Sequence, residues 1–256
     1  MSRIDTSPEV ETDASPGWRF PVRRVTFSEA AELLRESVAP FRAAPLRLIG
    51  VFLLLWLPIV FLASVQTLGP FLSDMAGAVA FTAYTCALDA ASRSEAPDFR
   101  HLGIVVRFGH DKLVLLMLSG LVPALVATGV LCGVWGIHET GRFLDELSRA
   151  NAHLPPAMDL DFEVAESIAG LPFTFVLPVW ALYRWSASRS MAANLLGCLV
   201  NWRWVLAMAV FSALAGNFLI WLRGEYDALA LVGATALEML SLSWTLALAR
   251  RSFPER

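Results

Sequence analysis

The chain has 256 residues, of which 56% are hydrophobic and 17% charged, with a mean hydropathy of +0.57 and a formal net charge of −3. Because soluble domains carry about 25% charged residues, this composition argues against an ordinary soluble domain and is typical of a protein with several membrane spans. The three cysteines lie in apolar runs without the spacing of a disulfide framework or a metal site, so we expect no metal or cofactor. They are Cys86, Cys132 and Cys198.

The N-terminal end of the sequence is polar. Residues 1–25 are expected to form a disordered cytoplasmic tail, because the stretch MSRIDTSPEVETDASPGWRF is rich in Ser, Thr, Pro and acidic residues. It also lacks the apolar centre of a signal peptide. Residues 26–251 are then predicted to form a single integral membrane domain.

Long apolar segments in this domain predict an all-α membrane protein with six transmembrane helices, since a span needs about 20 residues of helix. The predicted spans are 46–66, 71–91, 113–138, 164–185, 202–223 and 226–249. Between the third and fourth, an acidic outer loop contains a short helix with Phe143, Leu144 and Leu147 on one face. Pro155 and Pro156 are expected to end it.

Lys and Arg residues alternate in number from one connecting segment to the next. If the N-terminus is cytoplasmic, the outer segments hold only Arg142, Arg149 and Arg223, and all other Lys and Arg residues fall on the inner side. Positive residues are enriched in cytoplasmic loops. The sequence therefore predicts six spans with both termini in the cytoplasm.

A similar pattern precedes the first, third and fifth spans: an amphipathic segment with arginines, a polar break, and then a span. The breaks fall at Pro45, at 109–111 and at Asn201. We interpret this as three tandem units, 26–92, 98–185 and 186–251, each an in-plane amphipathic helix followed by a transmembrane hairpin. The first segment opens with the capping-box spacing of Thr26 and Glu29. In the simpler alternative, the three segments are only basic flanks of the spans.

Apolar residues recur at helical spacing in each amphipathic segment. They are Leu34, Val38 and Phe41 in the first, Leu102, Val105 and Val106 in the second, and Met191, Leu195, Cys198 and Leu199 in the third. In the third segment, Arg189 and Asn194 are expected to lie away from this stripe.

Three stretches carry a family resemblance: SVAPFRAAPLRLIGVFLLLWLP, CALDAASRSEAPDFRHL and RWSASRSMAANLLGCLVNWRWVLAMAVF. Over residues 27–251 the chain resembles a poorly characterised family of proteobacterial six-span inner-membrane proteins. It is more distantly similar to the membrane domain of some glycerophosphodiester phosphodiesterases. The resemblance implies a six-helix fold in the bacterial inner membrane and no established activity. The phosphodiesterase barrel is absent from these residues, so its catalysis is not carried over.

Glu238 lies near the middle of the last predicted span. A charged side chain at that depth costs about 3 kcal/mol on insertion scales, so Glu238 must face protein, pair or bind a proton. One hypothesis is a mid-membrane polar site for a proton or cation, formed by Glu238 with Asn217. The alternative is a neutral, hydrogen-bonded carboxyl that holds helices together through Asn217 or Ser243.

Other polar residues in the spans have simpler interpretations. Asp89 is predicted to pair with Arg93 at i,i+4 spacing, and Asp74 is expected to snorkel or cap near the outer face. Small residues such as Gly120, Ala124 and Thr128 repeat every four positions and predict a face on which helices approach closely. Histidines without metal-ligand spacing are expected at the membrane interface.

The basic face is predicted to contact anionic lipid headgroups rather than nucleic acid. The expected contacts are Arg42, Arg47, Arg100, Arg107, Arg189 and Arg203. The first functional hypothesis is a non-enzymatic scaffold, accessory subunit or lipid-interacting module, with a homo-oligomer or another membrane protein as partner. The alternative is a small-molecule or ion permease that uses Glu238, which predicts a polar cavity around that carboxylate.

Overall fold

The computed structural model describes residues 22–65, 68–97, 105, 108–147, 155–183, 185–223 and 227–254, except the side chains at 156, 217 and 219–228. Several predictions therefore lie outside the described residues. These are the tail up to residue 21, most of the second amphipathic segment with Arg100 and Arg107, and the side chain of Asn217.

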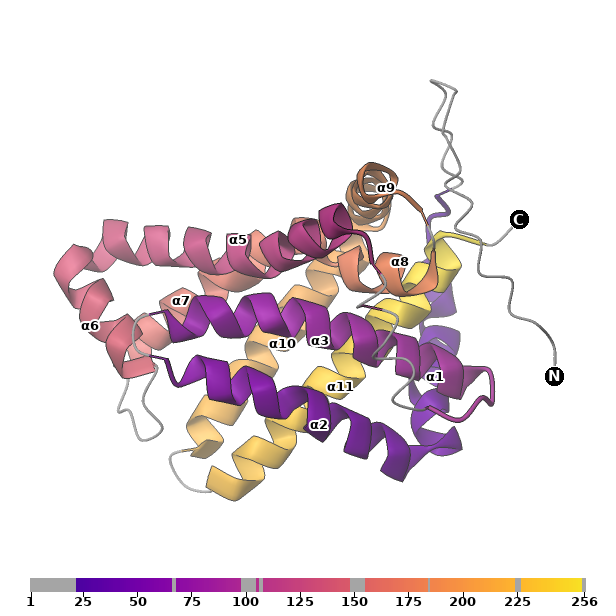
Figure 1. Cartoon of the computed structure of the whole chain (residues 1–256), viewed down its shortest axis with the longest axis horizontal. Coiled ribbons are helices and arrows are strands. Elements are labelled where there is room, and N and C mark those ends of the chain that lie inside the picture. Colours follow the sequence, from indigo (N-terminus) through magenta and orange to yellow (C-terminus); the bar gives the residue numbers. More distant parts are fainter. Residues whose placement is uncertain are drawn as a thin grey trace.

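Within these ranges every regular element is a helix (Figure 1). The elements are η1 (Phe27–Glu29), α1 (Ala30–Ala43), α2 (Pro45–Ala63), α3 (Gly69–Ser92), α5 (His110–Trp135), α6 (Ile137–Leu147), α7 (Pro156–Gly170), η3 (Leu171–Phe173), α8 (Val176–Leu182), α9 (Ala187–Val200), α10 (Trp202–Arg223) and α11 (Asp227–Ser252). Figure 1 shows α2, α3 and α5 along the longest axis, α6 at one end, and α1 running across the other end.

Five segments are long and apolar enough to cross a membrane: α2, α3, α5, the α7–α8 segment and the C-terminal part of α11. The helices α9 and α10 meet the same criterion as a pair, but their axes are bent by 84° at Asn201. The described part of the chain thus has five candidate spans, or six when this bent pair counts as one. The prediction of an all-helical membrane protein with several spans is confirmed in this form.

Several span boundaries differ from the prediction by a few residues, and two of these differences have local causes. The third span ends at Trp135 rather than 138, because Gly136 takes a φ of +86° that only glycine adopts readily and α6 begins directly after it. The fourth begins at Pro156 rather than 164, because proline suits the first turn of a helix. Acidic residues that we assigned to a loop therefore lie in α7.

The three-unit repeat remains a prediction, because most of its second in-plane helix lies outside the described residues. In the third unit, the predicted stripe is wrong in part. Asn194 is fully buried, whereas Leu195 and Leu199 have 44% and 71% of their surfaces exposed. The Asn194 amide can be buried here because it forms hydrogen bonds with backbone groups between α7 and α8.

Asp89 lies buried near the end of α3 and forms ion pairs with two arginines. The pair with Arg93 was predicted from its spacing and is confirmed. The second partner, Arg250, comes from α11 and also contacts Ser92. These contacts join the ends of α3 and α11 on the side of the molecule that holds α1.

The predicted small-residue face on α5 contacts α3, with Ala124 fully buried. Gly120 has no room for a side chain, since a Cβ there would lie 2.3 Å from the carbonyl oxygen of Asp74. We expect Gly120→Ala to lower the free energy of unfolding by about 1–3 kcal/mol, because α3 and α5 would have to separate. Denaturation in mixed micelles measures this change.

Gly129 provides a matched control on the same helix, because a Cβ there would meet nothing within 4 Å. Gly129→Ala should be neutral or stabilising by up to about 1 kcal/mol, as alanine is the better helix former. Equal destabilisation by both substitutions would contradict the close approach at Gly120.

Candidate functional site

A cavity of about 600 Å³ lies among the membrane-spanning helices. Its walls come from α2, α3, α5, α7, η3, α8, α10 and α11. The polar side chains that line it are carboxyls and hydroxyls: Ser73, Asp74, Ser119, Glu163, Glu166, Ser167, Thr174, Ser212, Glu238, Ser241 and Thr245. No lysine, arginine or histidine belongs to this described lining.

The four carboxyl groups reach the cavity from three helices: Asp74 from α3, Glu163 and Glu166 from α7, and Glu238 from α11. Within the described part of the chain, none of them forms a hydrogen bond or an ion pair. Glu238 is half-buried and lines the cavity. Unpaired carboxyls in such surroundings must bind protons or meet a cation.

Close helix packing positions the acidic residues on α7. A Cβ at Gly216 of α10 would lie 3.1 Å from a carboxylate oxygen of Glu163, so glycine leaves room for that side chain. Asp74 and Glu163 are both near enough to Glu166 for their charges to interact with it. These three carboxyls line the same cavity as Glu238.

Sequence reasoning found only part of this cavity. It singled out Glu238, but it predicted that Asp74 snorkels or caps near the outer face, and it placed Glu163 in the acidic outer loop. It gave Glu166 no role. The missed signal is the spacing of Asp159, Glu163 and Glu166, which puts acidic residues on one helical face over two turns.

The structure tests one of the two predicted partners of Glu238. Ser243 is not a partner, because its hydroxyl donates a hydrogen bond to the Ser37 carbonyl of α1 at 2.6 Å. The side chain of Asn217 lies outside the described residues, although its backbone belongs to α10. Pairing of Glu238 with Asn217 therefore stays a prediction.

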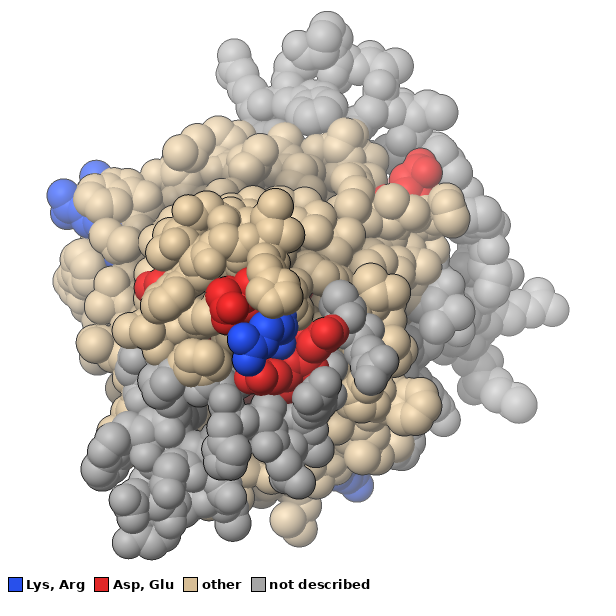
Figure 2. Space-filling view, turned by 90° about the vertical axis from the view of Figure 1, so that its left-hand side faces the viewer, with Lys and Arg blue, Asp and Glu red and all other residues tan. Residues whose placement is uncertain are grey.

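The α6 end of the molecule is acidic. Figure 2 looks onto this end and shows acidic side chains gathered around a basic one. The described acidic residues in α6 and the first turns of α7 are Glu139, Asp145, Glu146, Asp159 and Asp161. Arg142 pairs with Glu139 at 3.4 Å, and the indole N–H of Trp135 donates to Asp161 at 2.9 Å.

The predicted lipid contacts that the structure describes lie near helix ends. Arg42 and Arg47 are exposed on either side of the α1–α2 corner. The Arg203 guanidinium lies 5.6 Å from the centroid of the Trp202 ring, and that of Arg189 lies 5.2 Å from the centroid of Trp185. Arg100 and Arg107 are outside the described residues, and lipid binding by this set stays a prediction.

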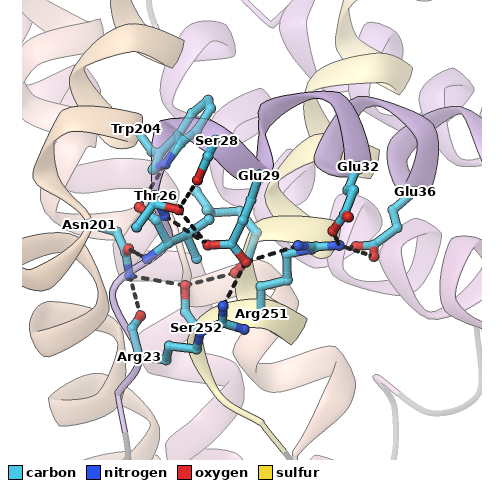
Figure 3. Close-up of polar contacts among 12 residues, drawn as sticks. Arg23, Thr26, Ser28, Glu29, Glu32, Glu36, Asn201, Trp204, Arg251 and Ser252 are labelled. Atoms are coloured by element: carbon cyan, nitrogen blue, oxygen red, sulfur yellow. Dashed lines mark hydrogen bonds and ion pairs between the residues drawn. The ribbon is translucent and has the colours of Figure 1, made fainter.

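A polar network joins the N-terminal segment to the end of α11 (Figure 3). Arg251 bonds to Glu29 at 3.0 Å, to Glu32 at 2.9 Å and to Glu36 at 2.6 Å. Its side chain is only 15% exposed, so these charge-assisted bonds are stronger than those of an exposed pair. The network holds α1 across the end of α11.

Asn201 forms the second part of this network and marks the 84° bend between α9 and α10. Its side-chain oxygen accepts from the Val25 N–H at 2.8 Å, and its NH₂ donates to Ser252 Oγ at 3.0 Å and to the Arg23 carbonyl at 3.2 Å. The Arg23 N–H also donates to the Ser252 carbonyl at 2.7 Å. We predicted Asn201 only as a corner; it also connects both ends of the described chain.

The predicted capping box at Thr26 and Glu29 is present, and it fixes one anchor of this network. The Thr26 N–H donates to Glu29 at 2.9 Å and is the main cause that lowers the pKa of Glu29 below its ordinary value, helped by Arg23 and Arg251. A lowered carboxyl pKa stabilises the fold above the unfolded-state pKa of about 4.3. That contribution is lost as the pH falls through the lower folded-state value.

We therefore expect Glu29→Gln to reduce stability at pH 7 and to weaken the loss of stability between pH 5 and pH 3. Thermal unfolding in detergent as a function of pH measures both effects. Glu95→Gln is the control, because Glu95 is exposed and its side chain has no hydrogen bond or ion pair among the described residues. Identical pH profiles for wild type and Glu29→Gln would contradict the role of Glu29.

The fourth span is broken beside the cavity, where η3 and a turn separate α7 from α8. Backbone groups freed at such a break need other partners inside a membrane. Asn194 of α9 supplies them: its side-chain oxygen accepts from the Phe175 N–H at 2.9 Å and its NH₂ donates to the Pro172 carbonyl at 2.5 Å. Phe173 and Thr174, between these two residues, line the cavity.

Comparison of the chain with protein-family models, with curated proteins and with solved structures found no match.

Proposed function

We propose that this helical membrane protein is a permease whose solute binds in the cavity beside Glu238. The observation that carries the proposal is the set of four carboxyl groups without partners among the described residues, around a cavity of about 600 Å³ between membrane-spanning helices. Small-molecule sites have volumes of roughly 300–1,000 Å³. Ionisable residues inside membranes commonly mark solute and proton pathways.

This cavity favours the permease over the scaffold or lipid-interacting module that the sequence suggested first. A scaffold needs packed helices, and solid packing around Glu238 would have favoured it. Half-buried acids that no other side chain pairs with reduce stability, because each carboxyl loses part of its hydration without a compensating bond. Such a cost is typical of functional sites rather than of structural cores.

Broken helices beside the cavity are a second support. Transporters place solute sites near the membrane midplane at discontinuous helices, and one part of the fold then moves against another. Here the α7–α8 break lies beside the cavity, and α9 and α10, which follow α8, are bent by 84° at their junction. Towards the α1 end, fully buried side chains of Tyr84, Leu88 and Val176 close the core.

In this proposal Glu238 exchanges a proton for the solute during the cycle. Loading and release then require the carboxyl to alternate between neutral and charged forms as its access changes sides. Following the family resemblance and the positive-inside pattern, we place the protein in the bacterial inner membrane with both termini cytoplasmic. We propose no catalytic step.

Reconstituted protein tests the proposal. Liposomes with a trapped pH-sensitive dye receive, in turn, inward gradients of sodium chloride, magnesium chloride, 1,4-diaminobutane and sodium benzoate. We expect at least one of these probes to drive a proton flux that protein-free liposomes lack. If the purified, folded protein moves protons with none of them, the permease proposal is wrong.

A further inference from the structure

The chemistry of the cavity lining defines what it can bind. Four carboxyls and seven hydroxyls face the cavity with two aromatic side chains, Phe81 and Phe173, and no cationic side chain belongs to this described lining. Carboxylates accept hydrogen bonds only, hydroxyls can accept them, and aromatic faces attract cations. An anion would meet four acids and no basic side chain, so the lining selects against it.

Among the four carboxyls, Glu238 gives the most specific indication of a ligand. It lies on α11 within a candidate span, is half-buried, lines the cavity, and has no hydrogen bond or ion pair to any described residue. The other charged groups on the lining helices that face it are also carboxyls: Asp74, Glu163 and Glu166. The missing partner of Glu238 must therefore be a proton or a positively charged ligand.

The size of the cavity and the spread of its acids favour an organic cation over a bare metal ion. Metal cations need several oxygen ligands converging at about 2.0–2.6 Å. Among the described residues, no group of three His, Cys, Asp or Glu side chains is placed to hold a metal ion. A cavity of about 600 Å³ instead has room for a flexible organic molecule with contacts to several walls.

Acidic residues continue from the cavity along α7 towards the α6 end. Asp159 and Asp161 precede Glu163 on α7, and the face shown in Figure 2 is acidic. Like charges along an approach raise the local concentration of cations and repel anions. The surroundings of the site thus favour the same class of ligand as its lining.

We propose that the cavity binds a small organic cation with primary amino groups, and that binding releases protons from the carboxyl cluster. This inference rests on the proposed function and names its solute class. The ammonium groups donate hydrogen bonds to carboxylates and hydroxyls, and the carbon chain lies against the Phe81 and Phe173 rings. Each positive charge that binds displaces about one proton, so the cavity remains near neutral. No covalent bond forms or breaks except that between each proton and its carboxyl oxygen.

Proton release by the full-length protein in detergent tests this inference. The protein is titrated at pH 7 in weak buffer with 1,4-diaminobutane, and released protons are followed with an indicator dye alongside calorimetry. Sodium chloride, magnesium chloride and sodium benzoate are the comparison probes at equal ionic strength. We expect saturable release with the diamine only, at least tenfold weaker binding in Glu238→Gln, and unchanged binding in Glu95→Gln.

The outcomes separate this inference from the permease proposal. If sodium or magnesium ions release protons as effectively as the diamine, the organic-cation inference is overturned, although a permease remains supported. If the diamine binds but no probe moves protons in liposomes, the binding inference stands and the permease proposal fails. If the diamine neither binds nor moves protons, the inference is overturned, whatever the other probes do.

Discussion

Glu238→Gln is expected to reduce solute-driven proton flux in liposomes by about 100-fold. Glutamine fills the same space but neither binds an exchangeable proton nor carries a charge. Removing one partner of a buried charge pair costs about 3–5 kcal/mol. A loss of about 2.7 kcal/mol in the binding free energy of the solute already lowers the occupancy of the site by about 100-fold. The measurement is the initial rate of the dye signal at equal amounts of reconstituted protein.

Stability separates this effect from misfolding. Because an amide is easier to bury than a carboxylate, Glu238→Gln should be as stable as the wild type or more so. Glu95→Gln is the matched control, and its flux should equal that of the wild type. A Glu238→Gln variant that folds and retains the full flux would show that the carboxyl has no part in transport.

Asn194→Ala is expected to lower the free energy of unfolding by about 3 kcal/mol. The substitution leaves the Phe175 N–H and the Pro172 carbonyl without their side-chain partner in a buried break. Each unsatisfied buried group costs about 1–3 kcal/mol. Unfolding in mixed micelles, with the loss of helical signal as readout, measures the change.

Leu195→Ala is the control on the same helix, because Leu195 is exposed and turned away from the break. Its effect should stay within about 0.5 kcal/mol. Since Phe173 and Thr174 also line the cavity, Asn194→Ala should weaken diamine binding as well. A variant with wild-type stability would mean that other groups satisfy the broken backbone.

The helical class of the fold follows from the sequence because hydrophobic runs of sufficient length have few alternatives in a membrane. The boundaries were harder to predict. Gly136 ends a span that hydropathy alone would continue, and Pro156 begins a helix, whereas we expected it to end one. Both effects depend on backbone conformation at one residue, which an average over a long window does not detect.

The cavity was only partly predictable for a different reason. Glu238 stood out because it lies among apolar residues, whereas Glu163 and Glu166 follow other acids and look like part of a solvated loop. Asp74 joins them where Gly120 lets α5 approach the backbone of α3 closely. That convergence is a property of helix packing, and periodicity within one helix does not specify it.

The contacts between α1 and α11 also affect the order in which the molecule can be completed during synthesis. α1 leaves the ribosome first, but the residues that hold it are made last: Ser243 contacts Ser37, and Arg251 contacts the three glutamates. Until translation reaches the C-terminal turn, α1 has no α11 against which to dock. Loss of the turn that contains Arg251 would therefore remove the ion pairs that fix α1, and only the Ser243 bond and the packing of α1 on α3 and α11 would remain.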